Sequence, residues 1–193
     1  MGTSTTISNF TEIDTRTPHS DAQQSLKFSN QHSFSKAELE QCSAGLLFGE
    51  SNAQLPTAPL LMLDRIIDIR ANGGLYERGY AVAELELNSS SWFFKHHFQG
   101  DPVMPGCLLI EAMWQLTGFH LAWSGYKGKG RVLGSGKTRF IEPVINNEQT
   151  LNISIHVRRV IVKASPISIA YGEVRADYEL KCKSDAIKIG LFP

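Results

Sequence analysis

Residues Cys107 to Trp123 carry the sequence CLLIEAMWQLTGFHLAW, in which apolar side chains occupy nearly every face of a helix. A helix that is apolar all round is typical of a buried core element. Pro102 and Pro105, just before it, exclude a regular helix or a central strand in that loop. We therefore expect a rigid loop followed by one long buried helix.

The segments on both sides of this helix predict strands. Upstream, the alternation of apolar and acidic residues near the end of Tyr76 to Leu87 indicates a strand, and Leu60 to Ile69 is compatible with a bent one. Downstream, three segments are typical of strands: Arg131 to Ile141, Thr150 to Val162 and Ile167 to Leu180. Strands, one helix and more strands predict an α+β fold, with an antiparallel sheet wrapped around the helix.

Shorter features complete the outline. Ser35 and Glu38 have capping-box spacing, which predicts a short helix from about Lys36 to Ser43. Asn72-Gly73 predicts a hairpin turn, and Trp92 to Phe94 forms a short aromatic segment. Residues 1–32 are rich in Ser, Thr and Gln and lack the apolar core of a signal peptide, so we expect a flexible extension before one domain at 33–193.

Composition limits the classes of function. Lys+Arg and Asp+Glu both number 19 among 193 residues, so the chain lacks the positive surplus that nucleic-acid binding requires. The three cysteines are far apart and form no C-x-x-C, which disfavours disulfides and zinc and favours a reducing, cytoplasmic location. The most apolar stretch, Val103 to Trp123, holds Glu111, Gln115 and His120, which are costly in a membrane.

Glu111 is the one carboxylate on the expected buried helix. Burial favours the neutral carboxyl group, which can donate a proton. Gln115 lies at i+4 on the same face and is placed to orient that group. The alternative is that Glu111 pairs with a basic side chain, or that this helix face is wet.

His96 and His97 precede the proline loop, and since neighbouring residues face different ways, only one of them is expected to enter a site. The alternative for a single histidine is an ordinary core or surface role. His97, Asp101 and Cys107 do not have a recognised metal-ligand spacing, so no metal is expected.

Gly106 and Cys107 lie where the helix is expected to begin. The free N–H groups and the positive end of the helix dipole at such a position can hold a developing oxyanion. Cys107 is either a nucleophile or a small residue that contributes only its N–H, and we favour the second interpretation. Together, a base (His97), amide donors and an acid (Glu111) suit the removal of water from a 3-hydroxyacyl thioester.

The sequence from Trp92 to Cys107, WFFKHHFQGDPVMPGC, and its continuation EAMWQL from Glu111 to Leu116 closely resemble the bacterial 3-hydroxydecanoyl-acyl-carrier-protein dehydratase/isomerase family. The resemblance runs from about Ser33 to Phe192. It includes LLFG near the start, GKGR in the middle and IGLF at the end.

The resemblance implies a hotdog fold, no cofactor, and a homodimer with its active sites at the subunit interface. It implies that His97 of one subunit faces Glu111 of the other, and that the Val103 carbonyl holds the His97 ring. It also implies a tunnel along the central helix for the acyl chain, and acyl carrier protein as the partner that presents the thioester.

Glu111 departs from the family pattern, because the isomerising branch usually has Asp at this position and the branch that only dehydrates usually has Glu. We therefore expect dehydration, with isomerisation of the trans-2 to the cis-3 product as an open possibility. Arg158, Arg159 and Lys163 are candidates for docking the acidic carrier protein, the alternative being solvated charges at strand ends. Two other functions remain open, a hotdog thioesterase and a non-catalytic module that binds acyl carriers.

Overall fold

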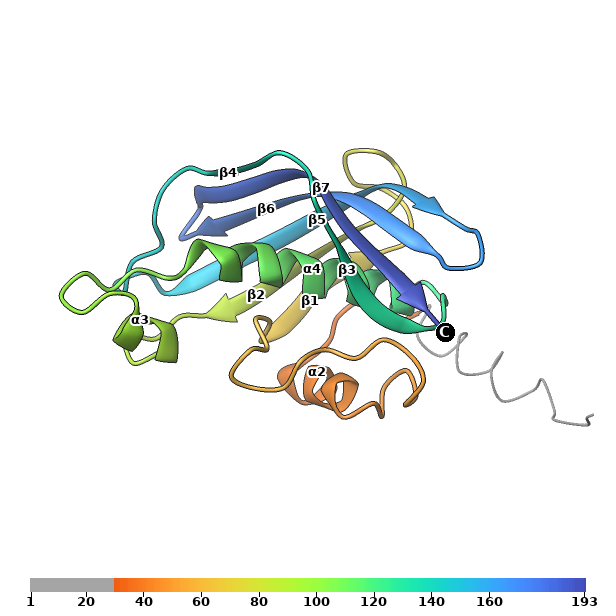
Figure 1. The fold of residues 1–193 in the computed structure, drawn as a ribbon, viewed down its shortest axis with the longest axis horizontal. Helices are drawn as coiled ribbons and strands as arrows, with labels where there is room; N and C mark the ends of the chain where they lie inside the picture. Colours follow the sequence, from red (N-terminus) through yellow and green to blue (C-terminus); the bar gives the residue numbers. More distant parts are fainter. Residues whose placement is uncertain (1–29) are drawn as a thin grey trace, which may run out of the picture.

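A computed structural model describes residues 30–193, and a seven-stranded antiparallel sheet is its main element (Figure 1). The sheet order is β1-β2-β5-β6-β7-β3, and β4 pairs with β7 beside this path. The strands are β1 (Arg65–Arg70), β2 (Tyr80–Glu86), β3 (Lys129–Ser135), β4 (Thr138–Phe140), β5 (Thr150–Ile161), β6 (Ile167–Ala176) and β7 (Glu179–Phe192). The helices are α2 (Lys36–Ser43), α3 (Trp92–His96) and α4 (Gly106–Trp123).

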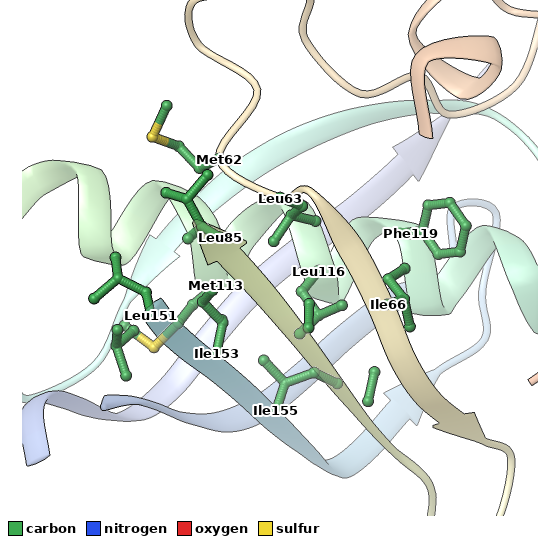
Figure 2. Packing of buried hydrophobic residues seen from close by; sticks show 14 of the residues in the cluster. Met62, Leu63, Ile66, Leu85, Met113, Leu116, Phe119, Leu151, Ile153 and Ile155 are labelled. Atoms are coloured by element: carbon green, nitrogen blue, oxygen red, sulfur yellow. The ribbon is translucent and has the colours of Figure 1, made fainter. Parts of the chain in front are cut away.

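Helix α4 lies along the inner face of the curved sheet (Figure 1). Its residues Met113, Leu116 and Phe119 are buried and point toward the strands (Figure 2). On strand β5, Leu151, Ile153 and Ile155 belong to the same core and are fully buried, while the residues between them are more exposed. Burial of this apolar surface is the main stabilising contribution to the fold, and the predicted buried helix is confirmed.

Helix α2 has the expected boundaries and capping box, with the Glu38 carboxylate accepting from the Ser35 backbone N–H at 2.7 Å. The aromatic segment after β2 forms α3, which buries Phe93 and Phe94. The turn between β1 and β2 is longer than a two-residue hairpin, because residues 71–79 all lie outside the two strands. Within Leu60 to Ile69, the strand begins only at Arg65.

Two strand predictions downstream of α4 were wrong in extent. The segment Arg131 to Ile141 is divided into β3 and β4, and β6 ends at Ala176, before a turn in which Asp177 and Tyr178 take positive φ values of 45° and 78°. The longest strand, β7, was missed. It carries three lysines that hide its apolar pattern, and register shifts interrupt its pairing with β6.

At the N-terminal end, Gln31 and His32 are attached to the domain. The Trp123 indole N–H donates to the Gln31 carbonyl at 2.9 Å, and the Ile69 backbone N–H donates to the His32 carbonyl at 3.0 Å. The rest of the predicted extension, residues 1–29, lies outside the described residues. Within the described part of the chain, α4 and the shorter helices all fall short of the length and apolarity needed to cross a membrane.

Candidate active site

His97 lies at the C-terminal end of α3, in a loop that folds back on itself. Its backbone N–H donates to the Phe93 carbonyl at 3.0 Å, and its carbonyl accepts from the Val103 N–H at 2.8 Å. The His97 ring completes this pairing, because its Nδ1 lies 3.0 Å from the Val103 carbonyl oxygen. Backbone groups of the loop therefore hold both the main chain and the side-chain ring of His97.

The contact with Val103 selects one tautomer of the His97 ring. A carbonyl oxygen only accepts, so the proton of the neutral ring must be on Nδ1. Nε2 then carries a lone pair and can act as a base. The ring is half-buried and stacks on Phe98, with ring centroids 3.9 Å apart.

Helix α4 begins at Gly106, directly after Pro105. The Leu108 N–H donates to the Pro105 carbonyl at 2.9 Å, whereas the Gly106 and Cys107 N–H groups have no hydrogen-bond acceptor among residues 30–193. These two amides are therefore available to a ligand at the positive end of the helix dipole. A Cβ atom on Gly106 would lie 2.8 Å from the ring of Phe140, so the glycine permits close packing there.

Glu111 lies in the second turn of α4 and is half-buried. Gln115 donates to its Oε1 at 2.9 Å, as the i+4 spacing predicted. No salt bridge joins Glu111 to a lysine or arginine within residues 30–193, so the alternative of a neutralising basic partner is not observed. The carboxyl group instead faces a cavity.

That cavity has a volume of about 160 Å³ and runs beside α4. Its walls combine Glu111, Trp114 and Phe119 of α4 with residues from β3, β7 and the loop after α2, among them Gln54, Leu55, Val132 and Ile189. Gln54 and Leu55 lie outside the helices and strands predicted from the sequence. Their role in the wall had no local signal, because it depends on where this loop crosses α4.

Two of the three cysteines are buried, and a buried thiol is a poor nucleophile. Burial raises the pKa of Cys42, which lines the cavity, to about 12. Burial also raises the pKa of Cys182 to about 11. Cys107 at the helix start is exposed, and all three cysteines are free.

His97 and Glu111 do not meet within one chain. No hydrogen bond joins them in the described structure, and His97 is absent from the wall of the cavity that Glu111 lines. Each residue instead has its own local partner, Val103 for His97 and Gln115 for Glu111. The same residues 30–193 contain no group of three or more His, Cys, Asp or Glu side chains placed to hold a metal ion.

The predicted docking residues lie at the far end of β5 and just beyond it. Arg158 donates to the Asp185 carbonyl at 3.0 Å and lies over the Tyr76 ring, 5.5 Å from its centroid. Arg159 and Lys163 are exposed. Arg158 is therefore partly engaged by the protein, whereas the other two are open to solvent.

Residues 55–184 match the model of the FabA-like domain. The chain belongs to the FabA-like domain family. The matched range includes the His97 loop, all of α4 and most of the sheet.

Two solved structures are similar to this FabA-like chain. The dehydratase heterocomplex ApeI:P from Xenorhabdus doucetiae is 18% identical, with a TM-score of 0.51, over 71% of this chain and 86% of that chain. A hypothetical thioesterase protein with coenzyme A from Streptococcus pneumoniae is 13% identical, with a TM-score of 0.48, over 65% and 83% of the two chains. At such identities the likeness concerns the fold alone, and the predicted α+β hotdog architecture is confirmed.

Proposed function

We propose that this FabA-like protein dehydrates (3R)-3-hydroxyacyl chains on acyl carrier protein to trans-2-enoyl chains, as a step of fatty acid synthesis. The observation that carries the proposal is the 3.0 Å contact between His97 Nδ1 and the Val103 carbonyl. It leaves Nε2 as a free base, and the first two amides of α4 are also free.

The chemistry assigns a role to each group. His97 Nε2 takes the proton from C2 of the thioester, and the negative charge that develops on the thioester oxygen is held by the Gly106 and Cys107 amides. A C2–C3 double bond then forms while the C3–O bond breaks. Glu111 gives its proton to the departing hydroxyl, which leaves as water.

This assignment requires two chains, because base and acid are not in contact in one. A homodimer would bring His97 of one subunit to Glu111 of the other. The edge of the sheet supports an interface, since Val132 and Leu133 on the edge strand β3 are 49% and 44% exposed, and Phe140 on β4 is 56% exposed. Exposed apolar side chains grouped at a sheet edge favour covering by another chain.

Substrate delivery and location are part of the same proposal. Arg159 and Lys163 are exposed cations suited to an acidic carrier protein, with Arg158 beside them. The cavity along α4 would take the acyl chain. No cofactor is needed for this reaction, and we place the protein in the cytoplasm.

The test uses the purified chain with a 3-hydroxydecanoyl thioester of acyl carrier protein. Formation of the conjugated enoyl thioester, followed by its ultraviolet absorbance, is expected without release of free thiol. Release of thiol without the enoyl product would identify a thioesterase instead. Binding of the acyl carrier protein without any turnover would identify a non-catalytic module.

A further inference from the structure

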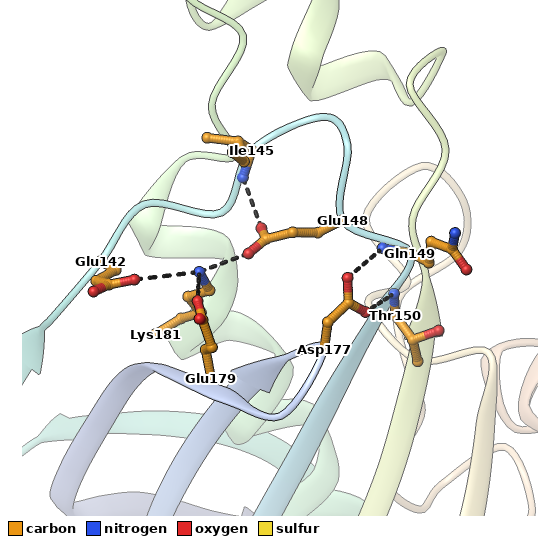
Figure 3. Close-up of polar contacts among 8 residues, drawn as sticks. All are labelled: Glu142, Ile145, Glu148, Gln149, Thr150, Asp177, Glu179 and Lys181. Carbon is orange, nitrogen blue, oxygen red and sulfur yellow. Dashed lines mark hydrogen bonds and ion pairs between the residues drawn. The ribbon is translucent and has the colours of Figure 1, made fainter.

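A buried lysine lies on β7, away from the groups assigned above. Lys181 is 3% exposed, and its ammonium group is surrounded by three carboxylates (Figure 3). Its Nζ lies 2.6 Å from Glu148, 3.3 Å from Glu179 and 3.6 Å from Glu142. A buried ammonium group is costly unless it is paired in this way.

Glu148 is the principal partner of Lys181. Its side chain is 11% exposed, whereas those of Glu142 and Glu179 are 57% and 70% exposed, so solvent screens the other two pairs. Burial alone would lower the pKa of Lys181, but the hydrogen bonds to Glu148 and Glu179 outweigh it and raise that pKa above its ordinary value. The lysine therefore stays charged, and the Lys181–Glu148 pair is held tightly.

The second oxygen of Glu148 fixes the backbone of a loop. Glu148 Oε2 accepts from the Ile145 N–H at 2.8 Å (Figure 3). The loop, residues 141–149, is also tied to the lysine directly, because the Ile141 N–H donates to the Lys181 carbonyl at 2.8 Å. Lys181 thus contacts the 141–149 loop near both of its ends, through its ammonium group and Glu148 at one end and through its backbone carbonyl at the other.

The 141–149 loop in turn holds the loop segment before α4 that carries the His97 acceptor, Val103. The Met104 N–H donates to the Val144 carbonyl at 2.8 Å, and Val103 forms an isolated antiparallel bridge with Ile145. Val103 is the residue whose carbonyl accepts from His97 Nδ1. An unbroken series of contacts therefore leads from the Lys181 ammonium group to the His97 ring.

We propose that Lys181 is a positioning residue for His97, acting through Glu148, the 141–149 loop and the Val103 carbonyl. Only the catalytic consequence rests on the proposed function, because the orientation of the ring is a property of the protein itself. The bound carbonyl keeps the proton on Nδ1 and aims Nε2 outward. A shift of the Val103 carbonyl loosens both constraints.

The test replaces Lys181 by Met, which keeps a long side chain and removes the charge. In the Lys181→Met variant we expect the ring-nitrogen NMR signals of His97 to change from one tautomer to a mixture of two. We expect kcat to fall about ten- to a hundredfold, with KM changed by less than about twofold. Lys183→Met is the matched control, because Lys183 lies on the same strand and has no ion pair within residues 30–193.

A second variant separates positioning from simple loss of stability. Lys181→Met leaves the Glu148 carboxylate buried without its cation, whereas Lys181→Met combined with Glu148→Gln removes both charges and keeps an oxygen that can accept from Ile145. The double variant should regain the single His97 tautomer and most of the lost kcat. If Lys181→Met does not fold, the folded double variant is compared with Lys181→Met combined with Glu148→Leu, which removes the acceptor of the Ile145 N–H and should show the tautomer mixture.

The proposal is overturned if Lys181→Met folds and retains both the wild-type His97 signals and the wild-type kcat. It is also overturned if kcat falls while the His97 signals are unchanged, because the effect then bypasses the ring. An unmodified protein that fails to dehydrate hydroxyacyl thioesters refutes the proposed function. The NMR comparison still decides the positioning role in that case.

Discussion

The Gln115 side chain donates a hydrogen bond to Glu111 Oε1 at 2.9 Å, and the same amide group is bonded on its other sides to the chain before β1. Its Nε2 also donates to the Leu60 carbonyl at 2.8 Å, and its Oε1 accepts from the Met62 N–H at 2.8 Å. These two backbone contacts fix the orientation of the amide, so an N–H must face Glu111. The position of the carboxyl group is thus set by the Leu60 to Met62 backbone.

Gln115→Leu should therefore affect stability and activity together. The substitution leaves the buried Met62 N–H and the Leu60 carbonyl without their partner, which costs about 1–3 kcal/mol for a buried polar group. It also frees the Glu111 carboxyl group, so turnover should fall. Urea unfolding and the dehydration assay measure the two effects. Gln41→Leu, at an exposed position of α2, should leave both unchanged, and an equal response of the two variants would refute the role of Gln115.

His97→Ala should abolish hydration and dehydration while leaving the fold and the proposed dimer intact. The loss expected for a general base is about 10²–10⁴-fold. His96→Ala is the matched control, because His96 is the exposed neighbour and should keep its activity. Full activity in His97→Ala would show that the base lies elsewhere.

Glu111→Gln should reduce dehydration by a similar factor, about 10²–10⁴-fold, because an amide cannot give up a proton to the leaving hydroxyl. The Gln oxygen can still accept from Gln115, so the free energy of unfolding should change little. Steady-state kinetics and a urea titration of the same preparation check both statements. If the variant matches the parent in rate, another group is the acid.

Glu111→Asp tests isomerisation. The family members that isomerise usually have Asp at this position, and Glu is one methylene longer, so the carboxyl group moves. We expect more cis-3 product from the Asp variant than from the parent when each is incubated with a trans-2-decenoyl thioester. Product analysis by gas chromatography gives the ratio. Absence of the cis-3 product from both proteins would mean that the acid does not control isomerisation.

His120 should make the stability depend on pH. Burial lowers the pKa of this histidine, although its hydrogen bond to the Arg70 carbonyl opposes the effect. Below about pH 6.5 the unfolded chain takes up a proton that the folded chain does not, so the free energy of unfolding falls as the pH falls. The slope for one group reaches about 1.4 kcal/mol per pH unit.

His120→Gln should lower the number of protons taken up on unfolding by about one, and the slope accordingly. The Gln amide can still donate to the Arg70 carbonyl but does not titrate. His156, whose pKa burial also lowers despite the opposing charge of Glu173, acts in the same direction and remains in the variant. Urea unfolding at several pH values between about 5 and 7 measures the slope. His96→Gln, at an exposed site, should keep the parent slope, and a parent slope in His120→Gln would contradict the assignment.

Local patterns were sufficient for the elements whose evidence is contained in a few neighbouring residues. The predominantly apolar sequence of α4 predicted its burial, the Ser35 and Glu38 spacing predicted the capping box, and the i+4 spacing predicted the bond from Gln115 to Glu111. Each of these depends on residues within a single helix, so no distant residue was needed. Strand β7 could not be predicted from its local pattern, because lysines and register shifts interrupt the alternation of apolar and polar residues.

The sequence by itself therefore determined the central helix, the groups that it carries and the loop that precedes it. Only the tertiary structure decided what holds those groups in place. Gln115 is anchored by Met62 and Leu60, which precede it in the sequence by 53 and 55 positions. His97 is connected to Lys181 through Val103, Ile145 and Glu148. Such contacts arise where separate segments of the chain cross, and this crossing is set by the packing of the whole sheet around α4, which no local periodicity encodes.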